Sequence, residues 1–337
     1  MKIRFQVQRH SSERGPWTET YELEAQPNTT VLDCLNRIKW EQDGSLAFRK
    51  NCRNTICGSC AIRMDGRAVL ACQQTLQGTL DRRERLEPSL ATTELTLQIQ
   101  PLGNLPVIKD LVVDMGEFWQ NLAQVDPYVS TASRSMAQKE FLQSPQERSA
   151  LNQVGNCILC GACYSECNAK SVTPEFVGPH ALAKAYRVLA DTRDSATQDR
   201  LTQYAQDLSG VWGCTRCFNC NSACPMEVAP LDQITRIKTQ ILAQPSEPET
   251  RPIRHRKAMI DLVAQGGWVD ERRFGLQVVG NRFRDLKGMF SLLPLGLNMI
   301  LHRKFPKTFE ASEGTLTVRS LIRSITMRES SPRKPQP

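Results

Sequence analysis

Four cysteines within eleven residues occur in a fixed spacing, and the same spacing returns further along the chain. The two runs are Cys157-Ile-Leu-Cys160-Gly-Ala-Cys163-Tyr-Ser-Glu-Cys167 and Cys214-Thr-Arg-Cys217-Phe-Asn-Cys220-Asn-Ser-Ala-Cys224-Pro225. The spacing C-x2-C-x2-C-x3-C is typical of bacterial ferredoxins, where three thiolates of a run bind one iron-sulfur cubane and the fourth binds its neighbour. Each run therefore needs the other, so the two segments must meet in the fold.

This exchange predicts two ligand sets. The first 4Fe-4S cluster would be held by Cys157, Cys160, Cys163 and Cys224, and the second by Cys167, Cys214, Cys217 and Cys220. We expect the three-residue gap to place the last cysteine of each run on the first turn of a helix. The alternative is structural zinc, which paired C-x2-C motifs also bind. Two runs of four, one ending in Cys-Pro, are more typical of ferredoxin.

A third cysteine group lies nearer the N-terminus, with the spacing C-x4-C-x2-C-x11-C. It consists of Cys52, Cys57, Cys60 and Cys72. The first three match the plant-type ferredoxin loop that holds a 2Fe-2S cluster. Gly58 has no Cβ, so the backbone can pass close to the sulfurs and direct N–H groups at them. A zinc ribbon is the alternative, although it usually has two C-x2-C pairs.

Cysteine usage also bears on the cellular compartment. The count of thirteen is odd, the chain of 337 residues is large, and its start, MKIRFQVQRH, lacks the apolar stretch of a secretory signal. We therefore expect metal ligands in a reducing cytoplasm instead of disulfides. Cys34 lies on the apolar face of a helix that Thr29 or Thr30 can cap, so it is predicted to be a buried core thiol.

Charge is unevenly distributed along the chain. Residues 251–337 carry 17 Lys and Arg against 7 Asp and Glu, whereas residues 1–250 carry 26 against 28. The larger part thus gives no electrostatic reason to expect nucleic-acid binding. The sequence contains no nucleophile–base pair, phosphate loop or dinucleotide fingerprint, so no catalytic residue is predicted. The four histidines, His10, His180, His255 and His302, lie outside both cysteine runs.

Hydrophobic patterns divide the chain into four parts. Residues 1–100 alternate apolar and polar positions around Phe5 and Leu97, which indicates half-buried strands. Residues 101–115 are rich in proline and glycine and suit a connection. Residues 116–244 have helical periodicity, with Pro179 at the first position of one helix. Residues 245–337 form a basic extension.

The extension contains an uncharged segment, GMFSLLPLGLNMIL, at residues 288–301. It is too short to span a bilayer. Basic residues flank it, namely Arg282, Arg284, Lys287, Arg303, Lys304 and Lys307, so an interfacial helix on anionic lipid is one interpretation. The favoured alternative is a segment broken by Pro294 and Gly296 and packed on this protein or on a partner subunit, because short apolar stretches are more often buried.

The order of these motifs, with PLGNLPVIKDLVVDM and GPHALAKAYRVLADTRD between them, resembles the iron-sulfur subunit of succinate dehydrogenase and fumarate reductase over about residues 1–240. The resemblance implies an α+β chain. An N-terminal β-grasp 2Fe-2S ferredoxin domain would precede an all-α helical ferredoxin domain with two cubane clusters, followed by the basic C-terminal extension.

The resemblance also implies a function. Electrons would arrive from FAD in a flavoprotein partner subunit, pass through the three clusters, and leave to a membrane-anchor subunit and to a quinone at or near the third cluster. The complex would lie at the cytoplasmic face of the membrane, with this chain peripheral. The rival interpretations are a fumarate reductase or thiol:fumarate reductase subunit and a heterodisulfide-reductase-like electron carrier.

Departures from the family pattern refine these expectations. Most members lack a cysteine at the position of Cys217 and hold a three-iron cluster there, so its presence predicts a second 4Fe-4S cluster instead of 3Fe-4S. Where members that bind ubiquinone show proline, tryptophan and histidine, this chain has Asn168, Val172 and Thr215. The tail resembles the C subunit of heterodisulfide reductase, which would fit a cysteine-rich membrane anchor.

Overall fold

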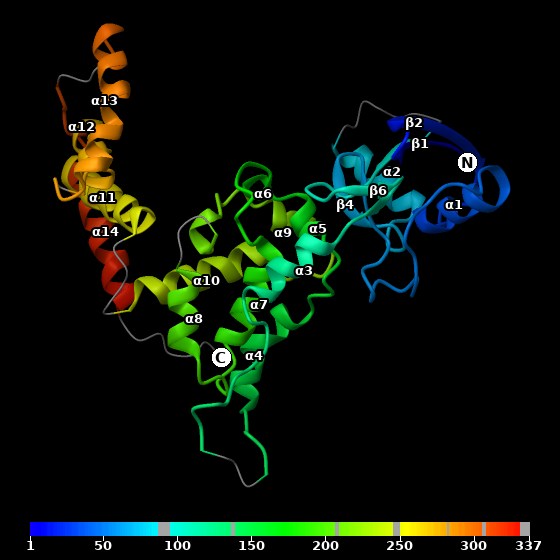
Figure 1. The fold of residues 1–337 in the computed structure, drawn as a ribbon, viewed down its shortest axis with the longest axis horizontal. Coiled ribbons are helices and arrows are strands. Elements are labelled where there is room, and N and C mark those ends of the chain that lie inside the picture. Colours follow the sequence, from blue (N-terminus) through cyan, green and yellow to red (C-terminus); the bar gives the residue numbers. More distant parts are fainter. Residues whose placement is uncertain are drawn as a thin grey trace. The chain divides into compact units, whose positions relative to one another are not determined.

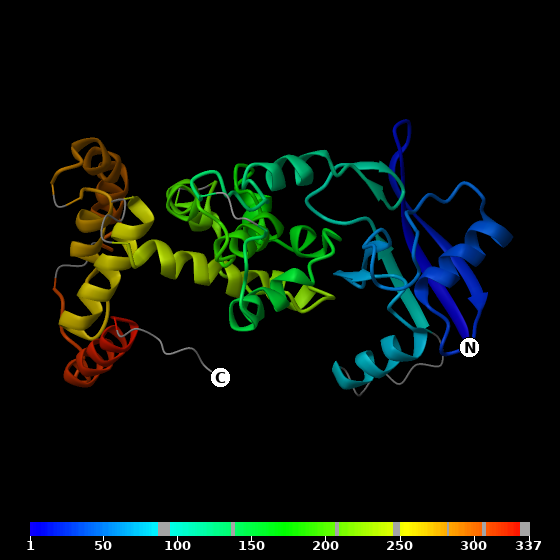
Figure 2. The ribbon, with the colours of Figure 1, turned by 90° about the horizontal axis from the view of Figure 1, so that it is seen from below.

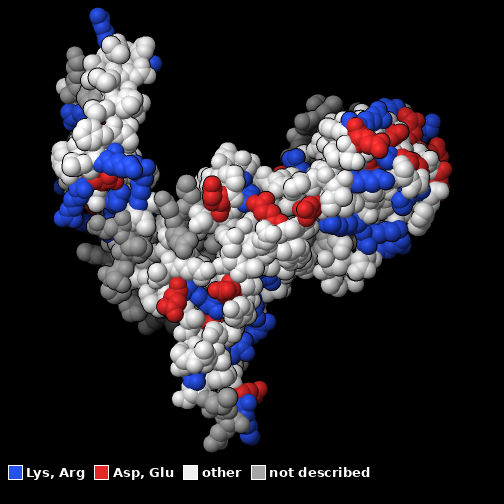
Figure 3. All heavy atoms as spheres, in the orientation of Figure 1, with Lys and Arg blue, Asp and Glu red and all other residues white. Residues whose placement is uncertain are grey.

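The computed structural model describes residues 1–86, 95–135, 139–205, 209–244, 250–281, 283–304 and 308–330. The chain divides into two compact units, Met1–Gln244 and Pro245–Pro337 (Figures 1 and 2). All thirteen cysteines belong to the first unit, which carries 26 Lys and Arg and 26 Asp and Glu. The second unit carries 17 basic and 9 acidic residues, so the whole net charge of +8 belongs to it. Figure 3 shows the charged side chains on one face of the molecule.

The first unit begins with a five-stranded sheet. Its strands are β1 (Lys2–Ser11), β2 (Gly15–Glu24), β3 (Ala61–Met64), β4 (Arg67–Leu70) and β5 (Leu95–Gln100). They lie in the order β2-β1-β5-β3-β4, with β1 and β5 parallel. The predicted alternation is confirmed, because Phe5 and Leu97 and their i±2 neighbours are buried.

Two helices accompany this sheet, α1 (Val31–Arg37), which continues into a π-helical turn η1 (Ile38–Gln42), and α2 (Leu76–Leu86). The hydroxyl of Thr30 caps α1 by accepting a hydrogen bond from the amide of Asp33 at 3.1 Å. Cys34 is fully buried in the core between α1 and the sheet, which confirms the predicted core thiol.

Residues 101–115 are more than a connection between domains. They contain a two-stranded hairpin, β6 (Val107–Lys109) and β7 (Val112–Val113). Leu105 and Leu111 are buried within the N-terminal core, so the segment packs as part of the domain. Proline and glycine at the start of this segment predicted that regular secondary structure ends there. They do not indicate which residues a hairpin packs against.

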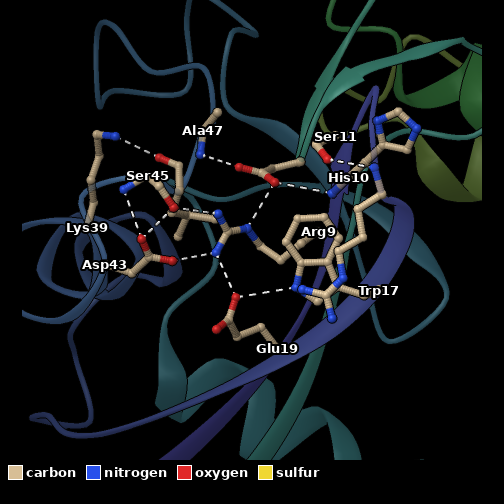
Figure 4. Close-up of polar contacts among 12 residues, drawn as sticks. Arg9, His10, Ser11, Trp17, Glu19, Lys39, Asp43, Ser45 and Ala47 are labelled. Carbon is tan, nitrogen blue, oxygen red and sulfur yellow. Dashed lines mark hydrogen bonds and ion pairs between the residues drawn. The ribbon is translucent and has the colours of Figure 1, made fainter.

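A buried arginine holds this hairpin to the sheet (Figure 4). Arg9 of β1 is 3% exposed, and its Nε donates to Asp110 Oδ1 at 2.9 Å in the turn between β6 and β7. Its other nitrogens donate to Glu19 and Ser45 at 3.0 and 2.9 Å and form an ion pair with Asp43. Asp110 is fully buried, and this guanidinium supplies the counter-charge to its carboxylate, which also accepts hydrogen bonds from the amides of His10 and Ala47.

Replacing Arg9 with methionine is expected to lower the free energy of unfolding by about 3–5 kcal/mol, because it leaves the Asp110 carboxylate buried without its counter-charge. The matched control is Arg4→Met in the same strand, since Arg4 and Glu22 form an exposed pair at 2.9 Å. The control is expected to cost less than about 1 kcal/mol. Urea unfolding of both variants measures the difference, and equal losses would contradict the role of the buried network.

The rest of the first unit is helical. Its helices are α3 (Gly116–Ala123), α4 (Pro145–Gly155), α5 (Ala162–Ser165), α6 (Asn168–Val172), α7 (Pro179–Leu189), α8 (Thr197–Tyr204), the 3-10 turn η2 (Val211–Gly213), α9 (Asn219–Ala223) and α10 (Pro230–Leu242). Pro179 occupies the first turn of α7, as predicted. Helices α7 and α10 pack together, and α5 lies beside α9. The fold class expected from the sequence is therefore confirmed.

The second unit consists of α11 (Arg251–Gly266), α12 (Glu271–Val278), α13 (Leu286–Leu301) and α14 (Thr315–Ser330). Helix α11 packs against α12 and α14. The expectation that Pro294 breaks the apolar segment is wrong, because α13 continues through it and none of its residues is buried. No helix in the described ranges has the length and apolar character needed to cross a bilayer.

Candidate metal centres

The first site lies where a loop meets one end of the sheet. The loop wraps its own sulfurs, since the amides of Asn54 and Cys57 each donate to Cys52 Sγ at 3.3 Å. The Thr55 hydroxyl lies 3.9 Å from Cys72 Sγ, which joins the loop to the fourth cysteine. Cys52 and Cys57 thus come together with Cys72, although they are separated from it by at least fifteen residues.

The β3–β4 hairpin brings the other two cysteines of this site together. Cys60 immediately precedes β3 and Cys72 follows β4. Because Ala61 pairs with Leu70 in antiparallel register, both cysteines project from the same end of the hairpin. The amide of Ala71 donates to the Cys60 carbonyl at 3.1 Å and continues the pairing beyond the strands. The structure therefore brings all four predicted cysteines to one place.

The second site is a cavity in the helical domain. It is lined by Cys157, Cys160, Cys163 and Cys224, with His180 and the apolar side chains of Ile158, Leu159, Met226 and Val228 around them. The amide of Val228 donates to Cys224 Sγ at 3.3 Å. Three cysteines of the first run and the last cysteine of the second thus surround one space, which is the exchange that the spacing predicts.

The third site combines Cys167 with the first three cysteines of the second run. Cys167 is the N-cap of α6, and Cys220 lies in α9. Burial raises the pKa of Cys220 to about 12, and the nearby sulfurs of Cys214, Cys167 and Cys217 raise it further. Cys217 is exposed, whereas Cys167 and Cys220 are buried. These four cysteines are not among the residues that line the cavity of the second site.

The two runs share a backbone conformation that suits an anionic centre. Positions three and five of each run have positive φ, at Leu159 (55°) and Gly161 (83°) and at Arg216 (60°) and Phe218 (65°). The first loop repeats the alternation at Arg53 and Thr55, with φ of 56° and 57°. Alternation between right- and left-handed residues turns successive N–H groups toward one point and forms the anion-binding nests found at iron-sulfur sites. These loops therefore fit the predicted clusters.

Two lysines hold the two runs in equivalent ways. Lys184 Nζ of α7 donates to the Cys157 carbonyl at 3.2 Å, and Lys238 Nζ of α10 donates to the Cys214 carbonyl at 3.3 Å. The first carbonyl of each run is thus bound by an ammonium from one helix of the packed α7–α10 pair. Positive charge at these places favours thiolates and anionic clusters. The sequence did not predict the role of either lysine. The available indication was that each lysine lies on a helix that follows a cysteine run.

The three sites adjoin one another within the first unit. A Cβ built on Gly58, which has φ of 69°, would lie 2.8 Å from Cys160 Cβ, so the first loop rests directly on the second site. The second and third sites meet where α5, which contains Cys163, lies beside α9, which contains Cys220. In keeping with this, burial and then nearby sulfurs that include Cys220 raise the pKa of Cys163 well above its ordinary value. The sites thus form a continuous series.

Thiol ionisation differs among the cysteines. Burial raises the pKa of Cys60 to about 12 and that of Cys160 to about 11. Burial also acts on Cys57, but hydrogen bonds from Ser59 and Cys52 outweigh it and lower the pKa to about 6. Burial thus disfavours the thiolate form of Cys60 and Cys160, and the positive charge of iron, when bound, would favour it.

One expectation about the surroundings of the sites is wrong, and one neighbouring residue was not expected. Cys224 is the C-cap of α9, and the next helix begins only at Pro230, so it does not lie on the first turn of a helix. His180 is distant from both runs in sequence but lines the cavity of the second site. Its Nε2 lies 2.9 Å from the Phe118 carbonyl, and burial lowers its pKa to about 3. It is thus a neutral donor to a carbonyl, with no titration near pH 7.

Comparison with known proteins decides the family. Residues 3–120 match the model of a 2Fe-2S iron-sulfur cluster binding domain, and residues 153–228 match that of a 4Fe-4S dicluster domain. Succinate dehydrogenase (ubiquinone) iron-sulfur subunit 3, mitochondrial, of Arabidopsis thaliana is 36% identical over 222 residues, which are 66% of this chain and 67% of that protein. The chain belongs to the family of succinate dehydrogenase and fumarate reductase iron-sulfur subunits.

Other relatives agree with this family. The fumarate reductase iron-sulfur subunit of Escherichia coli is 32% identical over 240 residues, which are 71% of this chain and 92% of that protein. A chain of the Mycobacterium smegmatis Sdh1 complex in the apo form shares the fold, with a TM-score of 0.62 at 21% identity over 74% of this chain and 99% of that one. The chain therefore has the 2Fe-2S and 4Fe-4S sites of an iron-sulfur subunit, which replaces the zinc interpretation.

Proposed function

We propose that this chain is the electron-transfer subunit of a succinate dehydrogenase and has no substrate site of its own. The observation that carries the proposal is the grouping of twelve thiols into three adjoining sites. Iron-sulfur clusters, when bound, accept and donate single electrons. The chain's own residues would place the three clusters one after another in space. Gly58 of the first site contacts Cys160 of the second, and Cys163 of the second site lies near Cys220 of the third.

We assign Cys52, Cys57, Cys60 and Cys72 to the 2Fe-2S cluster, with residues 1–100 as its domain. The cavity cysteines Cys157, Cys160, Cys163 and Cys224 are assigned to the first 4Fe-4S cluster, and Cys167, Cys214, Cys217 and Cys220 to the second, within residues 116–244. The nests of N–H groups and the two lysines support these assignments, because both stabilise negative charge at the same places.

Exposure suggests where electrons enter and leave. Among the twelve thiols, only Cys52 of the first site and Cys217 of the third are exposed, while the second site between them has none. We propose that FAD in the flavoprotein partner donates electrons at the first site. The third site would face the membrane anchor and its quinone, and the exposed apolar side chains of Val172 and Phe218, at 74% and 56%, support a partner surface there.

The test uses the complex purified from its native source under anaerobic conditions. Adding succinate is expected to reduce the 2Fe-2S centre, which becomes visible by electron paramagnetic resonance. Malonate, a dicarboxylate that cannot be oxidised in this way, serves as the control. If no flavoprotein copurifies and succinate leaves every centre oxidised, the proposal is wrong.

Fumarate reductase is the second candidate, because a relative with that name is 32% identical over 71% of the chain. The two candidates differ in direction, which depends on the reduction potentials of the centres and on the acceptor. Rates of succinate oxidation and of fumarate reduction by the same complex separate them. We expect succinate oxidation to be faster.

A further inference from the structure

Helix α13 exposes a broad apolar face. At 100° per residue, Leu286, Phe290, Leu293, Leu297 and Ile300 fall on one side, and with Pro294 and Leu301 they cover an arc of about 120° that contains no polar residue. The five side chains that define it are between 53% and 68% exposed. The other side of α13 packs on its own unit, since a Cβ on Gly275 or Gly280 would meet Leu292 or Met289.

Basic residues lie at both ends of this face. Arg284 and Lys287 are at the start of α13, and Arg303 and Lys304 follow its end. No acidic residue occurs between residues 286 and 309, and Asp285 caps the helix by accepting a hydrogen bond from the Gly288 amide at 2.7 Å. Figure 3 shows the uncharged surface of α13 with Lys and Arg beside both of its ends.

A basic hollow adjoins the start of α13. It has a volume of about 400 Å³ and is lined by Arg254, Lys257, Ala258, Asp261, Gln277, Asn281 and Arg284. Arg254, Lys257 and Arg284 bring three cationic side chains to this hollow, beside the carboxylate of Asp261. Basic hollows beside apolar helices suit phosphate headgroups.

We propose that the second unit binds directly to a membrane surface rich in anionic phospholipids. Helix α13 lies in the plane of the interface with its apolar face among the acyl chains, and the basic residues at its ends contact lipid phosphates. The hollow at Arg254, Lys257 and Arg284 receives one headgroup. The helix has sixteen residues and is about 24 Å long, which is too short to span the bilayer.

Charge argues for lipid over a second copy of the chain. Both ends of α13 are basic, so parallel and antiparallel pairing of two copies each bring cations against cations, which is unfavourable. A plane of phosphates instead offers counter-charge to both ends at once. The face is also wider than the seam of a two-stranded coiled coil, which uses only two positions in seven. This membrane contact is separate from the proposed anchor subunit and from dicarboxylate chemistry.

The test is cosedimentation of the full-length, cluster-loaded chain with vesicles. Vesicles of phosphatidylcholine with about 30% phosphatidylglycerol, which is anionic, are expected to bind at least tenfold more protein than phosphatidylcholine alone. The double variant F290S/L297S and the charge reversal R284E/K287E are each expected to reduce binding about tenfold or more. Leu142→Ser, which changes an 80% exposed leucine of the first unit, is the matched control and should bind like the native chain.

Several results would overturn the proposal. Equal binding to neutral vesicles would contradict the proposed binding to anionic lipid. Binding at the native level by both F290S/L297S and R284E/K287E would contradict it as well. Loss of binding with millimolar inorganic phosphate but not with the α13 variants would indicate a free-phosphate site only. A dimer that F290S/L297S dissociates in analytical ultracentrifugation would make a second copy the occupant. Unchanged far-ultraviolet circular dichroism and thermal unfolding show that the helices of the second unit still fold in the variants. Because no dicarboxylate is added, failure here leaves the electron-transfer proposal standing.

Discussion

Replacing Cys217 with alanine is expected to remove one iron from the chain and to produce the oxidised paramagnetic signal of a three-iron centre. Cys217 is the exposed member of the third site, whereas Cys167 and Cys220 are buried and would keep their irons. The chain should then fall from about ten irons to about nine, since one 2Fe-2S and two 4Fe-4S clusters hold ten. Iron analysis and electron paramagnetic resonance of the oxidised protein measure the change.

The control for this variant is Cys34→Ala. Cys34 is fully buried in the N-terminal core, so its loss should lower stability without changing the iron content. A three-iron signal already present in the native oxidised protein would contradict the assignment of Cys217 as a ligand. A native-like spectrum of Cys217→Ala would contradict it as well.

Replacing Gly58 with alanine is expected to disturb the first and second sites together. Gly58 has φ of 69°, and the added Cβ would lie 2.8 Å from Cys160 Cβ and 2.9 Å from Cys160 Cα, too close for contact with backbone. Relief requires the loop around Gly58 to move away from the cysteine run at residues 157–167. We expect a loss of about 2–4 kcal/mol in stability, from the left-handed conformation and the overlap combined, together with a much weaker 2Fe-2S signal.

Gly15→Ala and Gly66→Ala are the matched controls for this experiment. Gly15 and Gly66 have φ of 72° and 76° and nothing within 4 Å of an added Cβ, so they carry the same backbone cost without the overlap. Each is expected to cost about 1–2 kcal/mol and to leave the cluster spectra unchanged. If all three variants behave alike, the close approach of Gly58 to Cys160 does not hold the sites together.

Some features of the sites could be predicted from the sequence because they are local. The spacing of Cys157 to Cys167 and its repeat specify which thiols a short loop can turn toward one centre, and the left-handed residues within them follow from the same tight turns. Period-two alternation around Phe5 likewise indicates a strand, since a half-buried strand needs one apolar face. Such inferences require no knowledge of distant residues.

Other features depend on contacts between segments far apart in the chain. The hairpin at 107–113 is held by Arg9, a hundred residues earlier, through Asp110. Lys184 reaches the Cys157 carbonyl because α7 packs against α4, and Lys238 reaches the Cys214 carbonyl because α10 packs against η2. His180 enters the second cavity for a similar reason. Hydrophobic periodicity does not predict these contacts, because it indicates whether a side chain is buried but not which residues it contacts.

By itself, the sequence indicated the family, predicted the three groups of cysteines and assigned them to a β-rich domain and a helical domain, because ligand spacing and hydrophobic period act over a few residues. Only the tertiary structure decided that the groups adjoin through Gly58 and Cys163 and that α13 continues through Pro294 with one apolar face exposed. Which cysteine groups are adjacent and which helix faces are exposed depends on how segments distant in sequence pack together, and only the whole fold determines that packing.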